Sequence, residues 1–182
     1  MSTRHVVVMG VSGSGKSTIA AELAGRMNWR FADADDFHPE SNVAKMAAGT
    51  PLTDDDRWPW LRALTDWMSE SADRGESTVL ACSALRRSYR DVLRDCPPGV
   101  AFVHLAGPAE VILARMRSRQ DHFMPAALLE SQIATLEPLE PDEHGIVLDL
   151  ARPRESLVDA AEEWLTGPGG VEPPPDRPRR GG

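Results

Sequence analysis

The feature that most restricts the fold of this chain is a glycine-rich segment at residues 10–17. Its sequence, GVSGSGKS, matches the pattern G-x-x-x-x-G-K-[ST] of a phosphate-binding loop without a gap. A short apolar run at 6–9 precedes it, and apolar residues recur every fourth position after it, as on one face of a helix. A glycine-rich turn could match the pattern by chance, but the flanking strand and helix favour binding of a nucleoside triphosphate.

Each residue type in this loop has a chemical reason. Glycines let backbone N–H groups turn toward phosphate oxygens, and a helix start adds partial positive charge. Lys16 is expected to reach the β- and γ-phosphates, and the Ser17 hydroxyl to bind Mg²⁺. Of the 20 basic residues only Lys16 and Lys45 are lysines, so a compact ammonium is present where the motif needs one. The expected nucleotide-binding residues of the loop are Gly10, Ser12, Gly13, Ser14, Gly15, Lys16, Ser17 and Thr18.

The composition indicates one globular domain. The chain has 182 residues, of which 41% are hydrophobic and 26% charged, as is ordinary for such domains. The net charge of -8 argues against nucleic acid as a partner, although a local basic pocket can still bind a small anion. The two cysteines make no disulfide framework. With no leader and no apolar run of about 18 residues, we expect no membrane partner and a cytoplasmic location.

Strands and helices are expected to alternate along the chain. Strands are predicted at 5–9, 29–33, 77–82, 100–105 and 145–149, and helices at 16–27, 39–48, 58–73, 85–95, 108–118, 126–136 and 154–165. This alternation predicts the α/β fold class, with a five-stranded parallel sheet flanked by helices. Glycine and proline dominate the end of the chain, which predicts a domain at 1–166 and a disordered tail at 167–182.

Aspartates follow the second predicted strand. Ligands of parallel α/β sheets bind at the carboxyl ends of strands, where Asp33 and Asp35 alternate and so point the same way on extended chain. One carboxylate could serve Mg²⁺, and the other could accept a hydrogen bond from an attacking hydroxyl. The alternative is turn formation or helix capping, which Asp36 fits. A capping role is also expected for the acidic run 54–56.

Arginines follow the third predicted strand, which ends at Ser83. Arg86, Arg87 and Arg90 lie near the start of the next helix and could hold an anionic substrate together with the helix N-terminus. On a helix, residues 86 and 90 share a face while 87 points elsewhere. The alternative for these arginines is a solvated basic face.

A second arginine pair lies where the predicted helix at 108–118 meets a predicted loop at 119–125. Arg115 and Arg119 lie four residues apart and so share a helical face. They could pin phosphates or stack on adenine, with the loop closing over the site as a lid. Surface arginines are the alternative.

Several of these segments together resemble the gluconokinases, small P-loop kinases similar in fold to shikimate and adenylate kinases. The resemblance runs from about residue 5 to 165 and rests on residues 10–18, 33–35, 38–39, 45–46, 51–57, 82–85, 89–90 and 122–124. It implies ATP-dependent phosphorylation of D-gluconate on its 6-hydroxyl, with Mg²⁺, and it suggests a homodimer.

The resemblance also implies residue roles. By analogy with shikimate kinases, Asp35 matches the aspartate near the reacting hydroxyl and Asp33 the one near Mg²⁺. Arg115 and Arg119 match the adenine and lid arginines. The expected catalytic residues are then Lys16, Asp35 and Arg119.

The segment 39–73 is expected to bind the substrate, and residues near it are further candidates. The chemistry of gluconate indicates which residue types the site needs. The carboxylate of gluconate needs a cation, for which Arg57, Arg86 and Arg90 are the candidates, and its hydroxyls need polar partners, for which His38 and Ser83 are the candidates. Two other functions stay open. A shikimate-type kinase is disfavoured by residues 38–57, and a slow nucleotide-dependent switch is disfavoured by the missing N-K-x-D motif.

Overall fold

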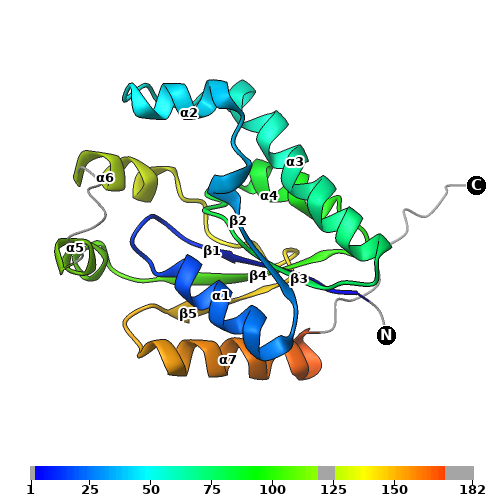
Figure 1. Ribbon diagram of the computed structural model, residues 1–182. Helices are drawn as coiled ribbons and strands as arrows, with labels where there is room; N and C mark the ends of the chain where they lie inside the picture. The colour runs from blue at the N-terminus through cyan, green and yellow to red at the C-terminus, as the bar shows by residue number, and fades with distance from the viewer. Residues whose placement is uncertain (1–2, 119–125, 171–182) are drawn as a thin grey trace, which may run out of the picture.

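The computed structural model describes residues 3–118 and 126–170, which form a five-stranded sheet between two layers of helices (Figure 1). The strands are β1 (His5–Met9), β2 (Arg30–Asp33), β3 (Thr78–Ala81), β4 (Val100–Ala106) and β5 (Gly145–Asp149). Their order is β2-β3-β1-β4-β5, and every neighbouring pair is parallel. The predicted fold class and sheet are confirmed.

The helices occupy the predicted segments with shifts at their ends. They are α1 (Lys16–Met27), α2 (Glu40–Ala47), α3 (Asp54–Asp73), α4 (Arg87–Arg94), α5 (Ala109–Ser118), α6 (Ala126–Thr135) and α7 (Arg154–Thr166), with 3-10 turns η1 (Ala34–Phe37) and η2 (Pro168–Gly170). Helices α1 and α7 lie on one face of the sheet, and α3 and α4 on the other (Figure 1).

The start of α3 follows from its capping residues. The Asp56 N–H donates to Thr53 Oγ1 at 3.2 Å, and the Thr53 N–H donates to Asp56 Oδ2 at 2.9 Å. This reciprocal capping box satisfies two N–H groups that a helix start leaves unpaired. It confirms the capping role of the acidic run and starts the helix at residue 54 instead of 58.

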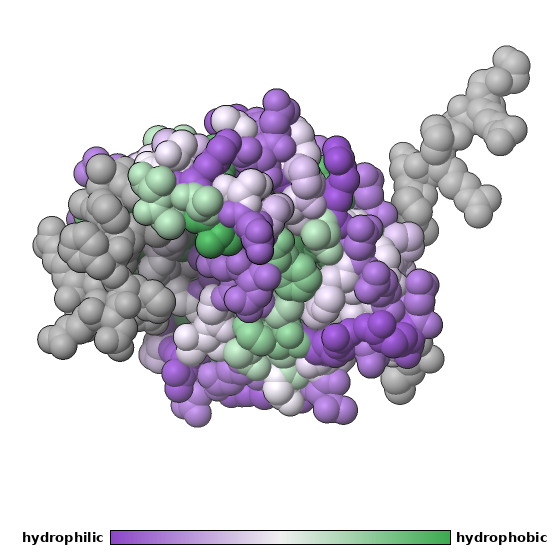
Figure 2. Space-filling model, turned by 45° about the horizontal axis from the view of Figure 1, so that its top comes forward, coloured by the Kyte–Doolittle hydropathy of each residue, from purple (hydrophilic) through white to green (hydrophobic). Residues whose placement is uncertain are grey.

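Strand β1 is buried on both faces, which explains its unbroken apolar sequence. Val6 and Val8 face the core beneath α1 and α7, and Val7 and Met9 face the core beneath α3 and α4, since successive side chains of a strand point to opposite faces. Hydrophilic residues cover most of the molecular face shown in Figure 2, where apolar residues gather in smaller patches.

The two ends of the domain are joined by Arg4. Its guanidinium donates to the Leu165 carbonyl oxygen at 2.6 Å and to the Gly170 carbonyl oxygen. Residues 167–170 therefore depart from the predicted disorder: they leave α7, form η2 and dock on Arg4, with Gly170 buried. The rest of the predicted tail, 171–182, lies outside the described residues. Within the described part of the chain, no helix has the length and apolar character needed to span a membrane.

Candidate active site

The loop between β1 and α1 has the shape of a phosphate cradle. Gly15 has φ +87°, and a Cβ at this position would meet no atom within 4 Å, so the space above its backbone is open. Ser14 is 1% exposed, and its Oγ is buried without a hydrogen-bond partner among the described residues. An open cradle at a helix N-terminus, lined by a free hydroxyl, fits a bound phosphate.

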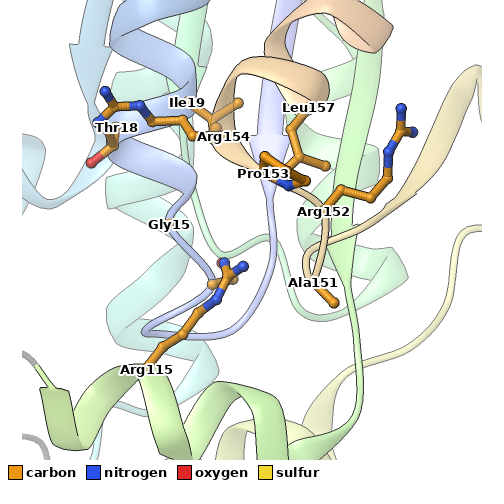
Figure 3. Close-up of a pocket in the computed structure, with 10 residues that line it drawn as sticks. Gly15, Thr18, Ile19, Arg115, Ala151, Arg152, Pro153, Arg154 and Leu157 are labelled. Carbon is orange, nitrogen blue, oxygen red and sulfur yellow. The ribbon is translucent and has the colours of Figure 1, made fainter.

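One cavity, of about 470 Å³, lies beside this loop; we name it the Arg115 cavity. It is lined by Ser14, Gly15, Thr18, Ile19, Arg115, Ala151, Arg152, Pro153, Arg154 and Leu157. Arg115 extends from α5 toward Gly15, and the segment that follows β5 closes the opposite side (Figure 3). The sequence predicted Ser14, Gly15, Thr18 and Arg115 here, but gave no signal for residues 151–154.

A second cavity, of about 590 Å³, lies on the other side of the loop; we name it the Asp35 cavity. It brings together six of the predicted site residues, which are Ser12, Lys16, Asp35, His38, Arg57 and Ser83. The phosphate-binding loop therefore separates two cavities and contributes residues to both.

Asp33 lies between the loop and the Asp35 cavity. The Ser17 hydroxyl donates to Asp33 Oδ2 at 2.7 Å, and the Asp35 N–H donates to Asp33 Oδ1 at 3.0 Å. The prediction that Asp33 and Asp35 alternate on an extended strand is wrong, because β2 ends at Asp33 and residues 34–37 turn into η1 with Asp33 as its cap. That turn places Asp35 on the wall of the cavity, which Asp36 does not line.

Charged groups of the site shift one another's proton affinities. Burial lowers the pKa of Lys16, and the Asp35 carboxylate is the largest opposing influence. Burial raises the pKa of Asp35, the Asp33 carboxylate adds to this, and Lys16 opposes it. Such coupled shifts are typical of groups that handle charge in a reaction.

Comparison with known proteins identifies the family. A family model described as an AAA domain matches residues 6–139. The gluconokinase of Gluconobacter oxydans is 50% identical over 140 residues, which cover 77% of this chain and 79% of that protein. The thermosensitive gluconokinase of Escherichia coli K12 is 46% identical over 147 residues, covering 81% of this chain and 79% of that protein. This chain belongs to the gluconokinase family.

Solved structures agree with that assignment. A sugar kinase from Janibacter sp. HTCC2649 is 61% identical, with a TM-score of 0.86, and the match covers 92% of this chain and 97% of that one. A gluconokinase from Sinorhizobium meliloti 1021 is 45% identical, with a TM-score of 0.80, covering 89% and 91% of the two chains. The resemblance that the sequence motifs predicted is confirmed.

Within this gluconokinase fold, Arg57 faces the Asp35 cavity from α3. Its guanidinium lies 5.4 Å from the centre of the Tyr89 ring and 3.4 Å from Asp54 Oδ1. Tyr89 donates its hydroxyl to the same Asp54 oxygen at 2.5 Å. Arg86 lies 3.9 Å from the other Asp54 oxygen, is exposed, and does not line the cavity. Of the two, Arg57 is the better placed for an anion in the cavity.

Arg90 is a structural residue, and the prediction that it binds substrate is wrong. Its side chain is fully buried, and its guanidinium donates to the Glu143 carboxylate at 2.6 and 3.1 Å. The remaining N–H groups donate to the carbonyl oxygens of Ala84, Leu85 and Pro138. All five donors of the guanidinium are used inside the protein, so none is left for a ligand.

Gln132 is a site residue that sequence reasoning missed. From α6, its Oε1 accepts the Ser12 N–H at 2.7 Å and its Nε2 donates to Ser12 Oγ at 3.3 Å. Gln132 also lines the Asp35 cavity. No motif marks it, because the contact joins residues 120 positions apart. The predicted lid at 119–125 with Arg119 lies outside the described residues.

Proposed function

We propose that this chain transfers the γ-phosphoryl group of ATP to the 6-hydroxyl of D-gluconate, giving 6-phospho-D-gluconate. The observation that carries this proposal is the pair of cavities that meet at the phosphate-binding loop. Lys16 and Asp35 line the same cavity, one suited to charge on the transferred group and the other to the attacking hydroxyl. The names of the similar proteins, gluconokinases and a sugar kinase, supply the substrate class.

ATP would occupy the loop and the Arg115 cavity. The loop residues Gly10, Ser12, Gly13, Ser14, Gly15, Lys16, Ser17 and Thr18 would enclose the phosphates. The N–H groups of Gly10, Ser12 and Ser14 already donate within the protein, so the other N–H groups of the loop and its side chains would make the phosphate contacts. Arg115, which reaches toward Gly15, would bind the nucleotide from the opposite wall. Arg119, matched to the lid arginine of related kinases, would add charge during transfer.

Mg²⁺ would be held by Ser17 and Asp33, whose oxygens are already 2.7 Å apart. Both are hard oxygen ligands of the kind that Mg²⁺ prefers. Among the described residues no group of three or more His, Cys, Asp or Glu forms a metal site. This suits a cation that takes one carboxylate from the protein and other ligands from phosphate and water. When bound, Mg²⁺ would neutralise charge on the β- and γ-phosphates.

Gluconate would occupy the Asp35 cavity, within the proposed substrate-binding segment 39–73 and its neighbours. Arg57 would pair with the carboxylate, and His38 and Ser83 would hydrogen-bond to hydroxyls along the chain. Asp35 would orient the 6-hydroxyl and accept its proton. A homodimer and a cytoplasmic location complete the proposal, and sedimentation and cell fractionation would test them.

The experiment is an ADP-release assay with purified protein, ATP and Mg²⁺ over a panel of sugar acids, shikimate and AMP. We expect turnover with D-gluconate and none above background with shikimate or AMP. The ³¹P spectrum of the product should show a phosphate monoester on a primary carbon. Turnover with a different acceptor and none with gluconate would contradict the substrate assignment and leave the kinase assignment intact.

A further inference from the structure

Asn42 is a buried polar residue of α2 that touches the acceptor side of the site without lining it. It is 2% exposed. Its Nδ2 donates to the backbone carbonyl oxygen of Asp56 at 3.0 Å and lies 3.2 Å from Nδ1 of His38. It is thus held between α3 and a ring that lines the Asp35 cavity.

These two contacts fix the proton position on His38. A carbonyl oxygen only accepts hydrogen bonds, so the Asn42 atom that faces Asp56 is the NH₂ group and not the amide oxygen. That NH₂ group has two hydrogens and no acceptor capacity. The second hydrogen points to His38 Nδ1, which must accept it and therefore carries no proton. A neutral His38 then carries its proton on Nε2, the one ring nitrogen that is left for a ligand.

The surroundings of His38 hold the ring in place and favour its neutral form. The ring stacks on Trp60 with centroids 4.2 Å apart and planes 14° apart, and Trp60 is itself anchored by its Nε1–H on the Ala34 carbonyl oxygen at 2.7 Å. Burial lowers the pKa of the His38 ring. Two charged groups face it: Asp35 of η1 favours the imidazolium and Arg57 of α3 opposes it. An imidazolium would also direct an Nδ1 proton at the Asn42 NH₂ group.

We propose that Asn42 is a positioning residue that keeps His38 as an Nε2–H donor, aimed at a hydroxyl of a polyhydroxy acid in the Asp35 cavity. The ligand class rests on the proposed function. The tautomer itself rests on the contacts of Asn42 alone. In this arrangement a hydroxyl at His38 is an acceptor, so its own proton is left to point at another group of the cavity, such as Asp35. One cavity therefore presents a donor and an acceptor to neighbouring positions of the ligand.

The first experiment compares His38→Gln with His38→Asn. Glutamine places its NH₂ group near the position of Nε2, whereas asparagine reaches only as far as Nδ1, and both lose the stacked ring. We expect the KM for gluconate to rise less than about threefold in His38→Gln and about tenfold or more in His38→Asn, as for loss of one hydrogen bond. The KM for ATP should stay within about twofold in both. Equal KM values for gluconate, or the lower value for asparagine, would overturn the proposal.

The second experiment reads the tautomer directly and needs no substrate. Two-bond ¹H–¹⁵N spectra of the imidazole rings separate the Nε2–H from the Nδ1–H form, and the His38→Gln variant identifies the signals of His38 among the five histidines. We expect Nε2–H in the wild-type protein at pH 7, and an Nδ1–H or charged ring in Asn42→Asp, whose carboxylate can only accept. An Nδ1–H signal in the wild type would overturn the proposal whatever the variants do. Failure of the proposed function would appear separately, as no ADP release from the wild type with gluconate.

Discussion

The Arg115 cavity and the Asp35 cavity share one loop but are built in different ways. On the loop side the Arg115 cavity has open space above the Gly15 backbone, and its far wall is largely one continuous segment after β5, residues 151–154. The Asp35 cavity is lined by side chains from η1, α3, α6 and the end of β3. Backbone N–H groups of the loop can bind the phosphates that all nucleoside triphosphates share. Selection among acceptor substrates therefore depends on the side chains of the Asp35 cavity, whose orientation must be fixed.

The residues that hold the side chains of the Asp35 cavity in place are connected by hydrogen bonds. Lys45 Nζ bonds both carboxylate oxygens of Asp56, at 2.9 and 2.7 Å, and the hydrogen bond from Lys45 lowers the pKa of Asp56 to about 2. Asn42 bonds the carbonyl oxygen of the same residue. Helix α2 is thus attached to the start of α3, and both present their residues to one cavity. Substitutions of residues in or next to the Asp35 cavity should change the kinetics with gluconate and leave nucleotide binding intact.

The largest effect is expected for Asp35→Asn, which keeps the size of the side chain and removes its charge. The kcat should fall about 10²–10⁴-fold, as for loss of a general base, and the dissociation constant of ATP should change little. Steady-state kinetics and a nucleotide titration measure the two quantities. Asp36→Asn is the matched control, since Asp36 is the neighbouring aspartate and does not line the cavity. An inactive control beside an active Asp35→Asn would move the catalytic role by one residue.

Lys16→Ala should lower kcat about 10²–10³-fold, because its ammonium would meet charge that develops on the transferred group. Lys45→Ala is the control, as the other lysine of the chain. Lys45 bonds Asp56 at 2.7 Å outside the phosphate-binding loop, so its loss should change the KM for gluconate through the contact between α2 and α3 and leave kcat within about threefold. Equal losses in the two variants would mean that lysine charge in general, and not its place in the loop, decides the rate.

Arg57→Ala should raise the KM for gluconate about tenfold to a hundredfold, the range expected when a charged group loses a hydrogen-bonded partner of about 1.5–3 kcal/mol. Arg86→Ala should have a smaller effect, because Arg86 is exposed and does not line the cavity. Both variants should keep the wild-type KM for ATP. The reverse ranking would place the carboxylate of gluconate at the mouth of the cavity, near Arg86.

The pH dependence of kcat/KM should report Asp35. Burial raises its pKa above the ordinary value of 3.8, and a general base must be ionised. Activity should therefore be complete above the raised pKa and fall about tenfold per pH unit below it. The contribution of Asp35 to stability has the opposite sign: the folded protein binds this proton more readily than the unfolded chain, so lowering the pH from the raised pKa toward 3.8 favours folding through this group. The residual activity of Asp35→Asn should lack this acidic limb.

The smallest effect concerns residues 167–182, of which the described part, 167–170, lines neither cavity. Truncation after Gly170 should leave the melting temperature unchanged, since residues 171–182 are rich in glycine and proline. Truncation after Thr166 removes the Gly170 carbonyl oxygen that Arg4 binds, and should lower it by roughly 2–4 °C, as about 1 kcal/mol does for a chain of this size. Thermal melts of the two truncated proteins test this. A loss in the longer one would mean that the predicted tail docks.

The sequence predicted what local rules control. The phosphate-binding loop, the strands of the sheet and the capping role of residues 54–56 each depend on neighbours within a few residues, and each is found where it was expected, although α3 starts four residues earlier than predicted. The predicted pairing of residues 86 and 90 failed because the rule assumes a continuous helix. Arg86 is extended, at φ -105° and ψ 146°, and α4 begins only at Arg87.

The rest of the site depends on contacts that no local rule describes. Arg90 became structural because Glu143, 53 positions later, supplies a buried carboxylate. Gln132 reached Ser12 because α6 packs beside the loop, and residues 151–154 line the Arg115 cavity because β5 is the edge strand next to β4. Each of these needs the three-dimensional arrangement of the sheet before the partner can be named.

The position of β1 has a consequence for how this chain is made. Among the strands of this sheet it is synthesised first, yet it lies in the middle, between β3 and β4. Its second neighbour, β4, ends at residue 106 and β1 at residue 9, so 106 − 9 = 97 further residues must leave the ribosome before β1 is paired on both sides. At about 5–20 residues per second, this strand, which is fully buried in the folded domain, waits several seconds with open edges. The nascent chain is therefore most exposed to aggregation, and most in need of a chaperone, early in its synthesis.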